Sequence, residues 1–264
     1  VLAVPLVAID TLHASTFAVA LLTSLATLPF VLVGLPAGAW VDRWPKRPVL
    51  LVADALRALT LVTIPLAWWL SVLTMAQLYA VTLVSGTLTV FFDVAYRSYL
   101  PVLVERDELV DGNGKLAATM AGAQVGGPAI GGSLVAALGA APAVLADALS
   151  FVVSCGSLLA IRAAEIPPER RPRHRGRLRG EIGEGLRFVW GEPRIRSVAA
   201  STATSNLFST MGLAVLLVFL RRELHVGPAR VGLLLAVGGT GGVLGAVLAP
   251  RMARRFGVGR AILW

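Results

Sequence analysis

Uncharged residues form five long runs along the chain, and this pattern predicts helices that cross a membrane. The runs contain 28, 35, 31, 24 and 20 residues and cover Ala14–Val41, Ala58–Phe92, Leu116–Ala146, Ser197–Leu220 and Val231–Pro250. A membrane-spanning helix needs about 20 predominantly apolar residues. The chain is 56% hydrophobic and 15% charged, whereas soluble domains have about 25% charged residues. The pattern therefore predicts an all-α protein that crosses a bilayer several times.

Two of these runs are too long for a single span and must contain a turn. The 35-residue run divides near Trp68 and Trp69, which suit a membrane interface. The 31-residue run divides where Gly139 and Pro142 favour a tight turn. The predicted spans are the end of a first span at Val1–Ile9, then Thr16–Val41, Val49–Leu70, Met75–Tyr96, Leu116–Leu138, Pro142–Ile161, Val198–Leu220 and Ala229–Leu248, with a ninth beginning near Ala261. We therefore expect about eight spans from a longer, truncated chain.

Lysine and arginine residues gather in alternate connections between the predicted spans. They number three, three, ten and four in Asp42–Pro48, Arg97–Lys115, Arg162–Arg196 and Arg251–Arg260. The connections between these have none, apart from Arg221, Arg222 and Arg230. Basic connections stay on the cytoplasmic side of a membrane, so the pattern fixes the expected orientation. Topology thus explains the net charge of +9, and we expect no nucleic-acid partner.

The longest basic connection separates two halves. We expect an N-terminal bundle at 1–162, a cytoplasmic linker at 163–196 and the start of a C-terminal bundle at 197–264. The basic stretch 171–179 is expected to touch membrane lipid. Apolar residues then recur at helical spacing, at Ile182, Leu186, Val189 and Trp190. This spacing predicts a short amphipathic helix on the inner membrane surface.

A glycine pattern occurs twice in the chain. Gly34 and Gly38 lie four positions apart before one basic turn, and Gly241 and Gly245 lie four apart before another, 207 residues later. Transporters are often built from such internal repeats. Ala249 in the second copy stands where the first has Asp42, so the two halves have diverged.

The first of these turns resembles the signature loop of the major facilitator superfamily, G-x-x-x-D-R-x-G-R-R. The matching residues are Gly38, Asp42, Arg43, Lys46 and Arg47, while Pro45 replaces the second glycine of the family pattern. The resemblance covers essentially the whole chain and implies twelve spans in two six-helix bundles. It also implies that Asp42 faces a helix of the opposite half, beyond Trp264. A plain stop-and-turn signal is the alternative interpretation.

Four ionisable residues lie inside or directly at the end of predicted spans near this turn. Asp54 and Arg57 are three residues apart, and Asp93 and Arg97 are four apart, so each pair shares a helix face. Charged groups in a bilayer usually pair and face the interior of the bundle. We expect a cytoplasmic charge cluster that joins spans two, three and four. The resemblance implies that Asp93 engages Lys46 as a gate latch, and static pairing is the alternative.

The fifth span carries a motif similar to one found in exporters of the superfamily. It consists of Gly127, Pro128, Gly131 and Gly132, although Ala123 stands where the fullest motif has glycine. Small residues four apart permit close helix packing, and proline kinks a helix. The alternative is generic helix packing without a bearing on transport direction.

Few polar residues remain to line a central cavity. The candidates are Gln124, Asp147 and Asn206, and Asp147 is the only acid within spans five to eight. A desolvated carboxyl is able to carry a proton, so Asp147 is a proton-coupling candidate. A hydrogen bond between helices is the alternative role for Asp147.

Together these features predict a proton-coupled exporter of small amphipathic molecules, similar to drug or siderophore exporters, that works by alternating access. We expect no cofactor, because the chain has no G-x-x-x-x-G-K-[ST] loop, a single Cys155 and histidines only in connections. We also expect a monomer. The expected location is the inner membrane of a bacterium, since 22 arginines against 2 lysines indicate a GC-rich genome. The alternatives are an uptake permease, an intramembrane enzyme and a non-transporting sensor, and no enzyme activity is expected.

Overall fold

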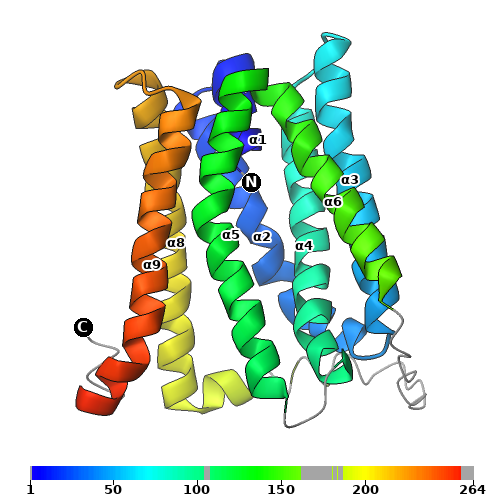
Figure 1. Cartoon of the computed structure of the whole chain (residues 1–264), viewed down its shortest axis with the longest axis vertical. Helices are drawn as coiled ribbons and strands as arrows, with labels where there is room; N and C mark the ends of the chain where they lie inside the picture. The colour runs from blue at the N-terminus through cyan, green and yellow to red at the C-terminus, as the bar shows by residue number, and fades with distance from the viewer. Residues whose placement is uncertain (1, 104–107, 162–179, 181–182, 184–186, 257–264) are drawn as a thin grey trace.

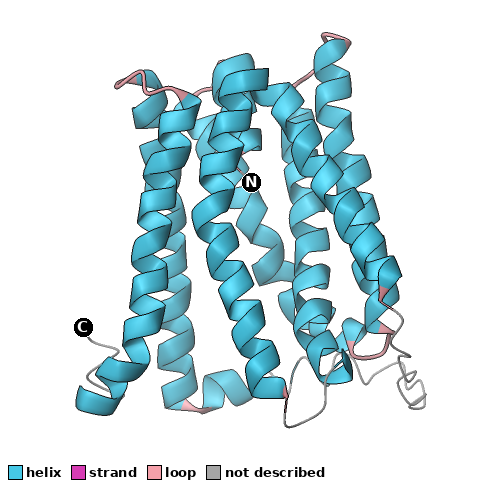
Figure 2. Cartoon of the chain, viewed as in Figure 1, coloured by secondary structure: helices cyan, strands magenta, loops and turns pink. Residues whose placement is uncertain are grey.

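The computed structural model describes residues 2–103, 108–161, 180, 183 and 187–256. Within these ranges the chain forms helices joined by turns and contains no strand (Figure 2). The elements are α1 (Ala3–Leu6), the π-helix η1 (Val7–Thr11), α2 (Thr16–Val41), α3 (Lys46–Trp69), α4 (Met75–Leu103), α5 (Leu109–Leu138), α6 (Ala140–Ala160), α8 (Pro193–Arg222) and α9 (Pro228–Phe256). The all-α fold class predicted from the sequence is confirmed.

Six of the described helices, α2 to α6 and α8, are long and apolar enough to cross a membrane. The predicted bounds of α2 match, but several other helices extend beyond their apolar runs. For example, α5 starts at Leu109 rather than Leu116, and an exposed ion pair of 2.8 Å between Lys115 and Asp111 supports its first turns. Helix bounds therefore depend on polar contacts that hydropathy does not register.

The two long uncharged runs do turn where the sequence predicts. α3 ends at Trp69, and Ser71 has a φ of 58° in the connection to α4. Gly139 has a φ of 87° between α5 and α6, a conformation that glycine adopts without steric cost. Residues 187–191 of the predicted amphipathic helix are helical. The remainder of that helix and the predicted ninth span lie outside the described residues.

The helices pack side by side, with their connections at two opposite ends (Figure 1). We call the end that carries Asp42 and Arg43 the inner end, and the end that carries Ser71 and Gly139 the outer end. α3 packs against α4 and α6, while α2 packs against α4. Contacts between the two halves of the chain run mainly from α5 to α9 and from α2 to α8.

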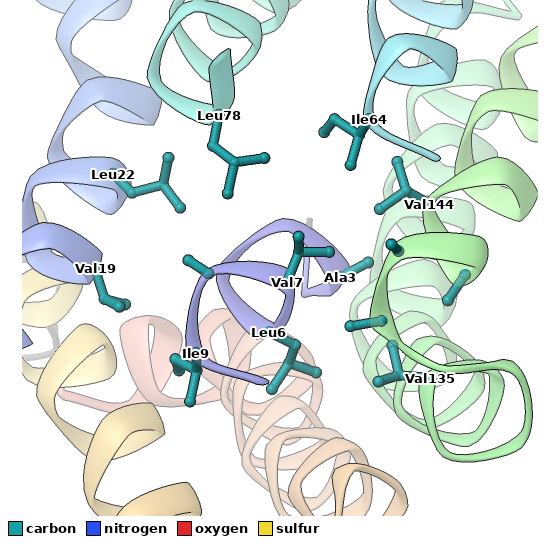
Figure 3. Packing of buried hydrophobic residues seen from close by; sticks show 14 of the residues in the cluster. Ala3, Leu6, Val7, Ile9, Val19, Leu22, Ile64, Leu78, Val135 and Val144 are labelled. Carbon is teal, nitrogen blue, oxygen red and sulfur yellow. The ribbon is translucent and has the colours of Figure 1, made fainter. Parts of the chain in front are cut away.

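The larger apolar core lies toward the outer end and contains residues from both halves. Figure 3 shows Leu6, Val7 and Ile9 surrounded by side chains from neighbouring helices, including Val19 and Val135. Residues of α8 and α9 belong to the same cluster, namely Leu217, Val218, Leu220 and Val231. Burial of these apolar groups between helices is therefore shared between the two halves at the outer end.

The smaller core lies at the inner end and contains only residues of the N-terminal half. Its buried members are Val41, Leu50, Ala95, Tyr99 and Leu158. In agreement with this, the inner parts of α5 and α9 lie farther apart than their outer parts (Figure 1). The structure thus has a joined outer end and, over the described residues, inner ends of α5 and α9 that diverge.

Candidate functional site

The signature loop holds the inner ends of three helices together. Asp42 is the C-cap of α2 and is exposed. Lys46 Nζ donates hydrogen bonds to the carbonyl oxygens of Val41 and Trp44 at 2.6 and 3.1 Å. A cation at a helix C-terminus interacts favourably with the free carbonyls and with the helix dipole. Lys46 therefore closes the last turn of α2.

Arg47 binds carbonyl groups at the C-terminal end of a helix much later in the chain. Its Nε and Nη2 donate to the carbonyl oxygens of Leu158 and Leu159, at 3.0 and 2.9 Å, at the C-terminal end of α6. Arg47 thus connects α3 to α6 across more than a hundred positions of sequence. The motif predicted a role for this side chain in the loop, but no sequence signal pointed to α6 as its partner.

A buried ion pair lies deeper in α3. Arg57 Nη2 donates to Asp54 Oδ1 at 2.7 Å, and the two residues are only 6% and 1% exposed. The sequence analysis placed both on one helix face, and the structure forms this pair. Asp54 Oδ2 and Arg57 Nε are buried without a hydrogen-bond partner among the described residues. Such unsatisfied atoms are costly in a low-dielectric interior.

Two aromatic rings enclose the Arg57 guanidinium. Its central carbon lies 4.4 Å from the ring centre of Phe92 on α4 and 4.6 Å from that of Phe151 on α6. A cation over an aromatic face gains about 0.5–2 kcal/mol, and more where water is excluded. These contacts replace part of the hydration that the buried cation loses.

Three carboxyl groups act on this single buried cation. Besides Asp54, both Asp93 on α4 and Asp147 on α6 interact electrostatically with Arg57. Cys155 on α6 completes the surroundings, and its Sγ donates to the Leu51 carbonyl oxygen at 3.6 Å. We call Asp54, Arg57, Asp93 and Asp147 the charge cluster.

The charge cluster joins α3, α4 and α6, whereas the sequence analysis expected spans two, three and four. α6 contributes to the charge cluster because Asp147 and Phe151, one helical turn apart, both face α3. Arg97 is exposed and acts electrostatically on Asp93. Asp147, which was considered as a cavity residue, lies near Arg57, while Gln124 and Asn206 are exposed in this chain.

One face of the Gly127–Gly132 motif in α5 packs against α9. A Cβ atom at Gly132 would lie 2.5 Å from the Pro228 carbonyl oxygen and 2.9 Å from the Gly232 Cα. A Cβ at Gly232 would in turn collide with the Pro128 carbonyl oxygen. The two backbones therefore approach so closely that neither glycine tolerates a side chain without a shift of the helices.

The other glycines singled out in the sequence face open space in the described part of the chain. A Cβ would meet no atom within 4 Å at Gly34, Gly38, Gly127, Gly131, Gly241 or Gly245. The contact between the two halves thus depends on the Pro128 and Gly132 face of α5 rather than on every small residue of the motif.

One pair of residues that connects the halves was not expected from the sequence. Arg221 and Arg222 stood out as exceptions to the charge rule, but no partner was assigned to them. In the structure Arg221 forms an ion pair with Asp10 of η1. The signal available in the sequence was the presence of an acid and two bases in connections that are otherwise nearly free of basic residues.

Comparison with known proteins agrees with this arrangement of helices and motifs. Residues 5–264 match the transmembrane secretion effector family of major facilitator transporters. The chain belongs to the major facilitator superfamily. No solved structure matches this facilitator with significance.

Several curated relatives are similar to this facilitator along most of its length. The multidrug efflux pump Tap of Mycobacterium tuberculosis is 32% identical over 258 residues, which cover 92% of this chain and 60% of that protein. Tap of Mycolicibacterium fortuitum is 30% identical, covering 87% of the chain and 58% of the protein. An uncharacterized MFS-type transporter of Bacillus subtilis, YfiS, is 24% identical, covering 95% and 59%. The chain spans about 60% of the length of these relatives.

The charge cluster generates a prediction about stability. Arg57→Met leaves the buried Asp54 carboxylate without its partner, and breaking a buried pair costs about 3–5 kcal/mol. We expect the free energy of unfolding, measured by denaturant titration of the full-length protein in detergent, to fall by about that amount. Asp54→Asn is the matched control and should cost less, because Asp93 and Asp147 still act on Arg57. A larger loss for Asp54→Asn than for Arg57→Met would contradict this assignment of partners.

The contact between α5 and α9 generates a second prediction. Gly132→Ala places a methyl group against the α9 backbone, and overpacking of this kind typically costs about 1–3 kcal/mol. Gly131→Ala is the matched control, because its Cβ enters open space on the same helix. We expect Gly132→Ala to reduce both thermal stability and transport, and Gly131→Ala to leave stability unchanged. Equal melting temperatures for the two variants would show that α5 and α9 do not pack in this way.

Proposed function

We propose that the complete protein exports small amphipathic molecules across a bacterial cell membrane. The observation that carries this proposal is the similarity to multidrug efflux pumps over 92% of the chain. The exporter-type motif supports it, because Gly132 packs tightly against Gly232 of the other half. The moving bodies are the bundle at 1–162 and the bundle that begins near 197, connected by the linker at 163–196. Alternating access then exposes a site between the halves to each side in turn.

We further propose proton entry as the driving force, with the charge cluster as the proton-binding site. Asp54, Asp93 and Asp147 all act electrostatically on the buried Arg57, and Asp93 also interacts with the exposed Arg97, so three carboxyl groups share two cations. Excess negative charge is expensive in a membrane interior, and a bound proton reduces it. Asp147 is the acid we assign to this role, while Gln124 and Asn206 are proposed to line the substrate path.

A transport assay tests the exporter proposal. Cells that express the full-length protein should accumulate less ethidium than cells with an empty vector, since an exporter removes the dye. A protonophore should abolish the difference if proton entry drives export. The measurement is intracellular fluorescence before and after protonophore addition. Increased accumulation would favour an uptake permease, and protonophore-insensitive export would remove the proton from the mechanism.

We also propose that Asp42 with Lys46, and Asp93 with Arg97, form a cytoplasmic latch that stabilises the closed inner end. In the structure Asp42 is exposed at the inner end of α2, where it is free to meet the opposite half when the inner ends approach. Two transport states differ by only a few kcal/mol, so loss of one latch contact shifts their populations.

The latch proposal leads to a test with a surface control. Asp42→Asn in the full-length protein should reduce transport and raise the labelling rate of cysteines on the cytoplasmic side of the path, with normal expression. Asp111→Asn removes a similarly exposed acid of α5, which pairs with Lys115 of the same helix, and should change neither quantity. Normal transport in Asp42→Asn would reject the latch and leave the loop as a topological and helix-capping element.

A further inference from the structure

The connection after the first span has an unusual backbone geometry. The amide of Leu12 donates to the Val7 carbonyl oxygen at 3.2 Å, and the amide of Ala14 donates to that of Ala8 at 2.9 Å. These hydrogen bonds span five and six residues, which is wider than an α-helical turn. Between the two donors, His13 has a left-handed φ of 49°. The helix therefore ends in a wide turn with a non-glycine residue at the left-handed position.

The connection after α8 repeats this geometry. Leu224 donates to the Phe219 carbonyl oxygen at 3.2 Å, and Val226 donates to that of Leu220 at 2.8 Å. His225 also has a φ of 49°. The Leu-His pair thus occupies the same turn in both halves, at positions 12–13 and 224–225. The two turns are structurally equivalent elements of the two halves.

This equivalence places opposite charges at matching positions. When His13 is matched to His225, Asp10 corresponds to Arg222. Arg221 directly precedes Arg222 in the same helical turn. An acid at the end of the first span therefore meets a pair of bases at the end of the seventh. Two equivalent turns that carry opposite charges are complementary when their helices approach each other.

The structure connects the two turns directly. Arg221 Nη2 and Nε donate to Asp10 Oδ1 at 2.6 and 3.0 Å. Arg221 Nη1 donates to the Val226 carbonyl oxygen at 2.6 Å, which holds the guanidinium in place. Arg222 Nη2 donates to the Ala14 carbonyl oxygen, across the same boundary. The side chains of Arg221 and Asp10 are 18% and 23% exposed, so the pair is partly shielded from water.

A cavity borders this ion pair at the outer end. It has a volume of about 270 Å³, and both Asp10 and Arg221 line it together with Trp68, Leu138 and Pro228. Its walls come from η1, α3, α5, α6 and the two ends that meet at the α8–α9 connection. The ion pair therefore lies where elements of both halves converge around a space that reaches the outer end.

We propose that Asp10 and Arg221 form an outer clasp, an ion pair that holds the outer ends of the two halves together and has to open when the transporter releases its substrate. The inference rests on the proposed alternating-access function and extends it to two residues of the outer end. The apolar cluster to which Leu6, Val7, Leu217 and Val218 all belong closes the same end. The clasp adds direction to that packing, because two N–H groups of the guanidinium converge on one carboxylate oxygen, which requires a defined orientation.

Opening of the clasp requires each charge to find another partner. Water that enters the cavity when the outer end opens supplies that partner, since both groups already lie within reach of solvent. The clasp therefore stabilises the closed outer end, and its two charges remain able to separate into water. This also accounts for two arginines on the side of the membrane where basic residues are rare.

An accessibility experiment in the full-length protein tests the clasp. Ala141 lines the cavity and is 1% exposed, so a cysteine there reports on outer opening. In an Ala141→Cys, Cys155→Ser background, Asp10→Asn should raise the labelling rate by a membrane-impermeant maleimide about tenfold, as expected for the loss of a charge-assisted hydrogen bond. The exchanged pair Asp10→Arg with Arg221→Asp should return the rate to within about twofold of the parent, because coupled residues compensate in a double exchange.

Arg230→Gln provides the matched control for this experiment. Arg230 is an exposed arginine at the same end of α9, outside the clasp, and its removal should leave the labelling rate unchanged. The clasp is wrong if Asp10→Asn labels at the parental rate, or if Arg230→Gln has the same effect. If Asp10→Asn fails to reach the membrane, the exchanged pair provides the test. The clasp then predicts that the Asp10→Arg, Arg221→Asp protein inserts and labels at the parental rate, and any other result contradicts it. Labelling needs no substrate, so failure of the clasp is distinguishable from failure of the export proposal.

Discussion

A charged group within a bilayer has to be neutralised inside the protein, and the structure is arranged around this constraint. Arg57 lies between α3, α4 and α6 with an ion pair to Asp54 and aromatic rings on both sides. At the inner end, Lys46 and Arg47 bind the free carbonyls of α2 and α6. In each case a cation connects neighbouring helices: Arg57 does so where water is excluded, and Lys46 and Arg47 do so at the partly exposed inner end.

The two halves are joined by a different principle, in which the absence of side chains matters most. Gly132 and Gly232 let the backbones of α5 and α9 touch, and no apolar side chain is able to replace that contact. At the outer end this packing continues into an apolar cluster shared by both halves. The inner-end cluster contains residues of the N-terminal half alone. The outer ends are thus joined, while the described inner ends of α5 and α9 diverge.

The charge cluster and the outer clasp have different physical characters. The charge cluster lies within one half, with Asp54 and Arg57 buried and Asp93 and Asp147 partly buried. It has more carboxyl groups than buried cations, which is why we propose it as the proton-binding site. The Asp10–Arg221 pair is partly exposed and connects the two halves, which suits a contact that forms and breaks during transport. Burial and membership of one half or both therefore distinguish the two sites, and on this basis we propose coupling for the charge cluster and gating for the Asp10–Arg221 pair.

The sequence alone determined which segments are helices, because uncharged runs, Gly139 and the break after Trp69 are local signals of chain geometry and solvation. It also determined the family, since the loop at Gly38–Arg47 and the motif at Gly127–Gly132 are local patterns. Only the tertiary structure decided which partners the charges have. Phe151 and Asp147 meet Arg57, Arg47 caps α6, and Arg221 binds Asp10, all across separations of about a hundred residues or more. Helix packing sets these contacts, and the periodicity of a single helix has no information on its neighbour.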